Sequence, residues 1–144
     1  MKHYFLNNDN FYNRILYYYN KEQENGNKLI VACDFDDTLY DCRNLGYDFS
    51  EMIELIKNIS KYVYVIIFTA RPEIEYSFVE EYLNKNNIPF NSINEDAPWI
   101  PQDRLSKKVY YHVLLDDKAG LSVAYNALNK LYIMLENKEG SNGK

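Results

Sequence analysis

Three aspartates, Asp34, Asp36 and Asp37, follow an apolar run in the stretch VACDFDDTLY, residues 31–40. Carboxylates this close together repel one another and raise each other's pKa unless a cation or hydrogen-bond donors compensate. Hard oxygen ligands with no histidine or cysteine among them favour Mg²⁺, which accepts carboxylates, waters and the oxygens of a phosphorylated substrate. The stretch therefore predicts a magnesium site beside a phosphate group.

Polar residues also follow two other apolar runs. Thr69 comes after YVYVIIF, residues 62–68, and Asp116 and Asp117 come after VYYHVLL, residues 109–115. A threonine hydroxyl and a lysine ammonium can hold a phosphate. A carboxylate that faces a magnesium-bound phosphoryl group can attack it to form an aspartyl phosphate, and a second carboxylate two residues along can protonate the leaving oxygen and then activate water.

Strands and helices alternate along the chain and form the frame for these residues. Apolar, β-branched runs predict strands at 29–33, 62–68, 88–93 and 109–115. Apolar residues at helical spacing predict helices over 9–24, 50–60, 73–87 and 120–137. Ser50 is the expected cap of the second helix, and Pro72 suits the entry to the third. This order predicts an α/β fold with a parallel sheet, in which ligands bind at the carboxyl ends of the strands.

Four segments in order, DFDDTL, FTARP, a lysine and LLDD, resemble the motifs of the haloacid dehalogenase-like (HAD) hydrolase superfamily over roughly residues 29–136. The resemblance implies a Rossmann-like three-layer sandwich with a mainly parallel sheet, and Mg²⁺ as cofactor. It implies that Asp34 is the nucleophile, and that Asp36 is the general acid and base and also gives its backbone carbonyl to the metal. By the same resemblance, Thr69 would bind the transferring phosphoryl group. Asp116 would complete the metal site, and Asp117 would reach the metal directly or through water.

The phosphate-binding lysine has two candidates, Lys107 and Lys108, which are adjacent. Lys108 stands eight residues before Asp116, a spacing similar to that of small phage-type and bacterial HAD members, so Lys108 is preferred. Ala70 and Arg71 are also expected at the substrate, because they follow Thr69 directly. Arg71 would contact a second anionic group of the substrate or, alternatively, pair with an acid of the helix that follows.

The residue at position 36 separates reaction classes within the resemblance. Dehalogenases lack an aspartate there, so Asp36 indicates a phosphatase or phosphotransferase. Asp37 stands where many relatives carry glycine, and it is interpreted as a tolerated variant. The flap LYDCRNLGYDF, residues 39–49, and the loop at 94–108 leave no room for an inserted cap domain. Trp99 in that loop is expected to pin the loop to the core. The alternative is that its ring stacks on a base or sugar of the substrate at the mouth of the site.

Composition bounds the remaining possibilities. The chain has 144 residues, 47% of them hydrophobic, which predicts one domain made of an N-terminal helical extension (1–27), a catalytic core (28–137) and a disordered tail (138–144). A net charge of −5 argues against tight nonspecific binding to nucleic acid. The two cysteines are expected to be free thiols. No apolar run reaches the length of a membrane span, so a cytoplasmic protein is expected.

The expected function is that of a magnesium-dependent phosphomonoester hydrolase that acts through an aspartyl phosphate. Its expected partner is a phosphorylated small molecule, such as a nucleotide or sugar phosphate. One alternative is a phosphatase of nucleic-acid ends, which a basic patch at Arg104, Lys107 and Lys108 would favour. Another is a HAD-fold protein that binds metal without catalysis. The sequence leaves the oligomeric state and the role of the tyrosine-rich N-terminal helix open.

Overall fold

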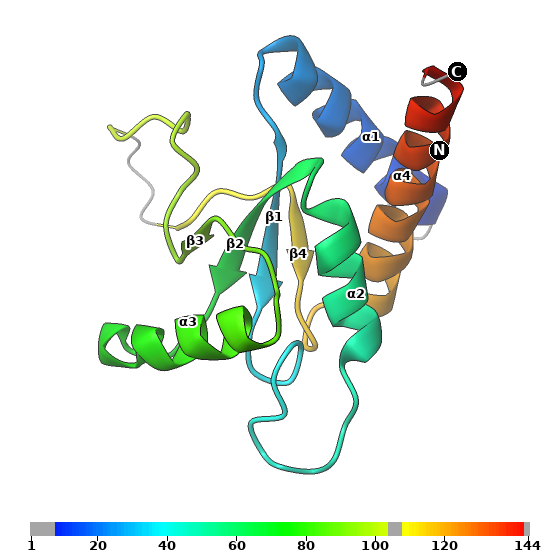
Figure 1. Ribbon diagram of the computed structural model, residues 1–144. Helices are drawn as coiled ribbons and strands as arrows, with labels where there is room; N and C mark the ends of the chain where they lie inside the picture. Colours follow the sequence, from blue (N-terminus) through cyan, green and yellow to red (C-terminus); the bar gives the residue numbers. More distant parts are fainter. Residues whose placement is uncertain (1–7, 104–107, 143–144) are drawn as a thin grey trace, which may run out of the picture.

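A four-stranded parallel sheet with strand order β3-β2-β1-β4 forms the centre of the computed structural model, which describes residues 8–103 and 108–142 (Figure 1). The strands are β1 (Leu29–Asp34), β2 (Val63–Phe68), β3 (Ser92–Ile93) and β4 (Val113–Leu115). β1 is buried over Leu29–Cys33, as expected for an apolar strand with parallel neighbours on both sides. The α/β class predicted from the sequence is confirmed.

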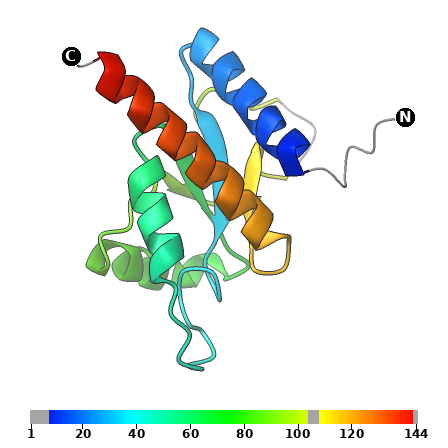
Figure 2. The ribbon, with the colours of Figure 1, turned by 90° about the vertical axis from the view of Figure 1, so that its right-hand side faces the viewer.

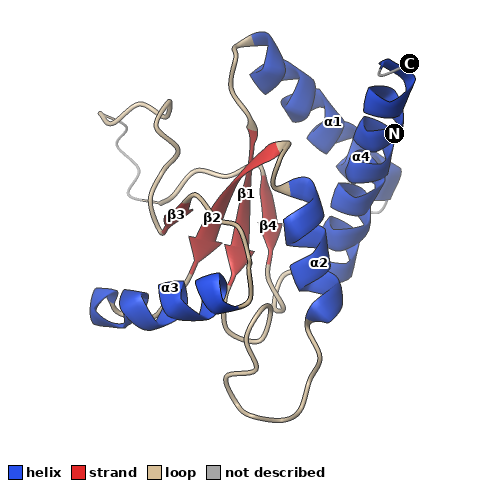
Figure 3. Cartoon of the chain, viewed as in Figure 1, coloured by secondary structure: helices blue, strands red, loops and turns tan. Residues whose placement is uncertain are grey.

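Within the described residues, the helices cover one face of the sheet (Figure 2). They are α1 (Asn8–Glu24), α2 (Ser50–Ile59), the 3₁₀ turn η2 (Glu73–Glu75), α3 (Tyr76–Lys85) and α4 (Leu121–Asn142). α4 packs against both α1 and α2 and lies between them. The flap connects β1 to α2 as an extended loop beyond the carboxyl ends of the strands (Figure 3).

The two faces of the sheet are covered differently. Val31 and Val65 belong to a core that includes buried residues of all four α-helices. On the other face, Ile30 and Ile66 pack against the connection between β3 and β4, which includes Trp99. A loop therefore supplies the third layer in a fold consistent with a Rossmann-like sandwich, and no cap domain is evident in the described residues.

Trp99 anchors that loop, as expected. Its ring meets the ring of Tyr64 edge-on, with 5.2 Å between the centroids. Tyr64 lies in β2, so the contact ties the β3–β4 connection directly to the sheet.

Two strands begin later than their sequences predict, because side chains replace backbone groups in the ladder. The Asn91 side chain accepts a hydrogen bond from the Val65 N–H at 2.8 Å, and β3 starts only at Ser92. In the same way, His112 Nδ1 accepts from the Ile30 N–H at 2.8 Å, and β4 starts at Val113. The predictions of strands over 88–93 and 109–115 were therefore too long.

Helix ends also differ from the predictions. The third helix opens as the 3₁₀ turn η2 and becomes α-helical only at Tyr76. Ser50 lies inside α2 instead of capping it, and its N–H donates to Asp48 Oδ1 at 2.8 Å. Asp48 thus satisfies the first N–H of α2 from the flap.

The prediction of a disordered tail over 138–144 is wrong for residues 138–142, because α4 continues to Asn142. Three contacts support the last turns of α4. Lys61 forms ion pairs with Glu136 and, at 3.5 Å, with Glu139. The Ser141 hydroxyl also donates to the Asn137 carbonyl at 3.0 Å.

No helix within the described residues combines the length and the apolar character needed to cross a membrane. Cys33 is buried, Cys42 is exposed, and both are free thiols, as the sequence predicts.

His112 is buried at the junction of α1 and the sheet, with 1% of its side chain exposed. Because Nδ1 accepts the Ile30 N–H, the neutral ring carries its proton on Nε2. That atom lies 3.7 Å from Glu22 Oε1, and the Tyr18 ring lies 5.0 Å away, centroid to centroid. Burial lowers the pKa of His112 to about 4, well below its usual 6.5.

His112 should make the protein less stable at mildly acidic pH. The unfolded chain takes up a proton near pH 6.5 and the folded chain only near pH 4, so the free energy of unfolding falls as pH decreases through this window. We expect a loss of about 2 kcal/mol between pH 7 and 4.5, measured by urea unfolding against His112→Asn. Asparagine keeps an acceptor for the Ile30 N–H but does not titrate. The contributions of all other titrating groups therefore cancel when the unfolding free energies of the two proteins are subtracted. Parallel pH profiles for the two proteins would contradict the assignment.

Candidate active site

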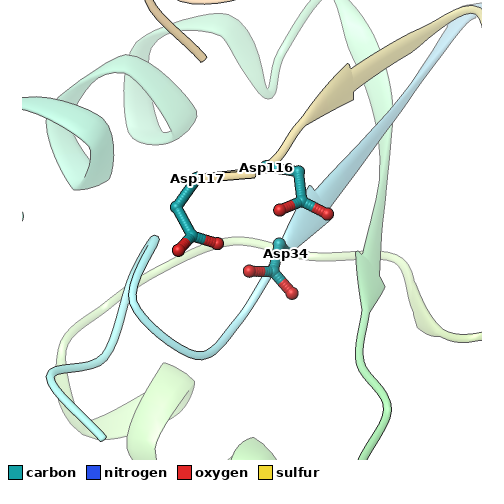
Figure 4. A group of neighbouring side chains, drawn as sticks. All are labelled: Asp34, Asp116 and Asp117. Atoms are coloured by element: carbon teal, nitrogen blue, oxygen red, sulfur yellow. The ribbon is translucent and has the colours of Figure 1, made fainter. Parts of the chain in front are cut away.

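Three carboxylates converge at the carboxyl ends of the adjacent strands β1 and β4 (Figure 4). Asp34 is the last residue of β1, and Asp116 and Asp117 follow β4 directly. The two strands are parallel with Cys33 opposite Leu115, so the residues that follow this pair must meet. One oxygen from each carboxylate lies within 4.8 Å of the others.

The ionised form of Asp34 is unfavourable in this cluster. Partial burial and the negative charge of Asp116 raise the pKa of Asp34 to about 7, against the ordinary value of 3.8. A hydrogen bond from the Thr38 hydroxyl acts in the opposite direction. A divalent cation would remove the repulsion, and three hard oxygen donors are the set that Mg²⁺ prefers. The described residues therefore fit the magnesium ion that the sequence predicts.

Thr38 organises the carboxylates, although the sequence analysis did not single it out. It is fully buried, and its hydroxyl donates to Asp34 Oδ2 at 3.1 Å and accepts from the Asp117 N–H at 3.2 Å. One hydroxyl thus bridges the ends of β1 and β4. Its place in the DFDDTL stretch, directly after the acids, was the available signal.

Asp36 does not join the three carboxylates, because its side chain pairs with Arg71. The Arg71 Nη2 lies 2.7 Å from Asp36 Oδ1, and Nε lies 3.0 Å from Oδ2. Arg71 also lies 3.5 Å from Glu75. The alternative in which Arg71 pairs with an acid of the following helix is thus present in the structure, together with a second pairing that the sequence analysis did not foresee.

Thr69 is held at the end of β2 by Asn94, which follows β3. Asn94 Oδ1 accepts from the Thr69 N–H at 2.9 Å, and Asn94 Nδ2 donates to the Thr69 carbonyl at 2.7 Å. Asn94 has φ 54°, in the left-handed region that asparagine tolerates better than most residues. The Thr69 Oγ1 accepts from the Arg71 N–H at 3.1 Å. The sequence analysis missed Asn94, whose signal was its position directly after a strand.

Asp37 has φ 58°, a conformation that glycine adopts without steric cost. Glycine would therefore also suit position 37. The Asp37 carboxylate pairs with Arg43 of the flap at 3.0 Å. Asp37 is therefore a turn residue that anchors the flap.

The preferred lysine, Lys108, lies beside an aromatic ring of the segment that leads into β4. Its Nζ lies 5.7 Å from the centroid of the Tyr111 ring. Lys107 and Arg104, and with them the question of a basic patch, lie outside the described residues. Ala70 is exposed beside Thr69.

A cavity of about 500 Å³ opens beside Thr38, between the flap, α2 and the start of α4. Phe49, Met52 and Tyr125 give it apolar walls, and Asp48 and Glu51 also line it. Its place next to Thr38 puts a pocket of small-molecule size beside the carboxylates.

Comparison with known proteins supports the fold and leaves the chemistry open. No protein-family model and no curated protein sequence matches the chain. A solved structure of a conserved protein from Bacteroides thetaiotaomicron is similar, with a TM-score of 0.56 and 21% sequence identity over 78% of this chain and 93% of that one. The likeness confirms the Rossmann-like α/β fold, and that protein's description states no activity.

Millimolar Mg²⁺ should raise the melting temperature of the protein, because the ion would bind the carboxylate cluster only in the folded state. At a concentration of about 100 times Kd, the gain in stability would be about 2.7 kcal/mol. Asp116→Asn should remove most of this shift in a thermal melt. Asp48→Asn, which keeps the acceptor for the Ser50 N–H, should retain it. Equal shifts in the two variants would place the ion elsewhere.

The metal-free protein should lose stability through Asp34 as pH rises. Because the pKa of Asp34 is raised in the folded state, the folded chain binds more protons than the unfolded chain between about pH 4 and 7. The free energy of unfolding should therefore fall across this window, by on the order of 1 kcal/mol after allowance for solvent screening. Urea unfolding in EDTA would measure it against Asp34→Asn. The same pH slope in wild type and in Asp34→Asn would refute this prediction.

Proposed function

We propose that this chain is a magnesium-dependent phosphomonoester hydrolase of the HAD type, which acts through an aspartyl phosphate. The supporting observation is the convergence of Asp34, Asp116 and Asp117 at adjacent strand ends. Asp36 and Thr69 come from the same edge of the sheet, where they follow β1 and β2. Acids and a threonine in the order of the HAD motifs thus share one edge of a Rossmann-like sheet.

The proposed reaction has two steps. In the first, an Asp34 oxygen bonds to phosphorus as the ester P–O bond breaks, and Asp36 gives its proton to the leaving oxygen. In the second, Asp36 takes a proton from water as the water oxygen attacks phosphorus and releases phosphate from Asp34. The sum is phosphomonoester plus water giving an alcohol and inorganic phosphate.

Mg²⁺, when bound by Asp34, Asp116 and Asp117, supplies positive charge that offsets the negative charge of the phosphoryl oxygens. Thr69 would donate its hydroxyl to one of these oxygens. The Asn94 clamp fixes the backbone of Thr69, so the hydroxyl starts from a defined place. Lys108 is the cation that this proposal assigns to the phosphate.

The cavity beside Thr38 supports a small phosphorylated substrate, such as a nucleotide or a sugar phosphate. Its volume of about 500 Å³ suits a leaving group of nucleoside size. Phe49 and Tyr125 offer apolar faces, while Asp48 and Glu51 would disfavour a second anionic group in this cavity. The same acids would disfavour an oligonucleotide backbone. A cytoplasmic location is part of this proposal.

A phosphatase assay with Mg²⁺, p-nitrophenyl phosphate and a panel of nucleotides and sugar phosphates tests the proposal. We expect turnover that is lost in EDTA and in Asp34→Asn, and a fall of about 10² to 10⁴ in kcat for Asp36→Asn. Glu139→Gln, at the far end of α4, should retain wild-type turnover. Oligonucleotides with 3′- or 5′-phosphates belong in the panel, and their preference over small substrates would overturn the proposed substrate class. Folded, magnesium-bound protein without turnover would instead favour a non-catalytic metal-binding role.

A further inference from the structure

Arg71 grips the Asp36 carboxylate at both oxygens. Nη2 lies 2.7 Å from Oδ1, and Nε lies 3.2 Å from Oδ1 and 3.0 Å from Oδ2. A planar guanidinium that meets a carboxylate in this way restricts its rotation, which a single point charge does not. The orientation of Asp36 is therefore set by a residue that follows β2.

Arg71 is itself held in place by its surroundings. Its guanidinium carbon lies 5.7, 5.8 and 5.2 Å from the ring centroids of Phe35, Tyr40 and Phe78. These rings pack on one another, with Phe35 stacked on Tyr40 at 5.3 Å and Phe78 edge-on to Tyr40 at 5.5 Å. An arginine over several aromatic faces has little freedom to move. The rings come from the turn after β1 and from α3, so two elements fix its position.

The Arg71–Asp36 pair is also partly exposed, with 22% and 31% of the two side chains accessible. Ion pairs at this level of exposure contribute little to folding stability. The pair lies at the edge of the sheet where the carboxylates converge. Its geometry is therefore better explained by the position that it imposes on Asp36 than by stabilisation of the fold.

We propose that Arg71 is a positioning residue that holds the Asp36 carboxyl group in the orientation needed to give its proton to the leaving oxygen. This inference rests on the proposed phosphatase function. In this role Arg71 would act through Asp36 and not by contact with the leaving oxygen or phosphorus. A catalytic acid must stay within hydrogen-bond reach of the oxygen that it protonates. Loss of the Arg71–Asp36 contact should therefore lower kcat for substrates whose leaving group needs a proton.

The dependence of kcat on the leaving group of the substrate distinguishes this positioning role of Arg71 from a structural role. p-Nitrophenolate leaves without a proton, whereas the alkoxide of benzyl phosphate needs one. We expect Arg71→Met to lower kcat for benzyl phosphate at least about tenfold more than kcat for p-nitrophenyl phosphate, with little change in KM. Methionine keeps an apolar chain on the aromatic rings, so the fold should persist. Arg71→Lys should change the two kcat values in the same direction but by less than Arg71→Met, because lysine can keep one contact with the Asp36 carboxylate.

Arg43→Met is the matched control. Arg43 pairs with Asp37, next to Asp36, and this substitution removes the same positive charge as Arg71→Met. It should leave the ratio of the two kcat values unchanged. A double variant, Arg71→Met with Asp36→Asn, should have the same ratio of the two kcat values as Asp36→Asn alone. Both changes remove the same function, which is proton donation by Asp36.

Equal losses for the two substrates in folded Arg71→Met, or an unchanged ratio in both Arg71 variants, would overturn the positioning role and leave the proposed function intact. A wild-type protein that turns over neither substrate in Mg²⁺ would overturn the proposed function, and this inference with it. A ratio that changes equally in Arg43→Met would assign the effect to net charge instead of to the grip on Asp36.

Discussion

Repulsion among three carboxylates at one strand edge is the constraint around which the candidate site is built. The parallel register of β1 and β4 forces Asp34, Asp116 and Asp117 together. Partial burial, together with the negative charge of Asp116, raises the pKa of Asp34 to about 7. Within the chain, the Thr38 hydroxyl offsets part of this cost by hydrogen bonds to both sides. A bound cation would offset much more, because it interacts with all three charges at once. Stability and the proposed metal binding would thus be coupled at the same point of the fold.

A chain of contacts extends from this cluster along the sheet edge. Asn94 after β3 clamps Thr69 after β2, the Thr69 hydroxyl accepts from the Arg71 N–H, and Arg71 grips Asp36 after β1. Asn94 at one end of this series of contacts, and Asp37 next to Asp36 at the other end, adopt left-handed backbone conformations. Such conformations persist where surrounding contacts compensate for the strain, as the Thr69 clamp does for Asn94. The proposed catalytic groups are therefore held mainly by contacts among the ends of three strands, and Tyr40 at the start of the flap packs against Arg71.

Much of the frame was predictable from the sequence because strong signals agreed. Apolar runs that end in acids predicted β1 and the convergence at its carboxyl end, and helical spacing predicted α1 and α2. Boundaries were less predictable at β3 and β4. There, Asn91 and His112 use side chains in place of backbone groups to bond the neighbouring strand, which an alternating residue pattern does not show. The end of α4 was missed because residues 138–144 were interpreted as a disordered tail, while the contacts of Lys61 come from a distant part of the chain.

The sequence by itself determined the α/β class, the order of the elements and the identities of the acids at the strand ends, because these depend on local residue patterns. Only the tertiary structure decided the partners of those acids. It joined Asp36 to Arg71, 35 residues away, and Thr69 to Asn94, 25 residues away. It also gave Thr38 its bridging role between Asp34 and the Asp117 N–H, 79 residues away. The physical reason is that such pairings depend on distances between segments remote along the chain, which are set only when the sheet brings the ends of its strands to one edge.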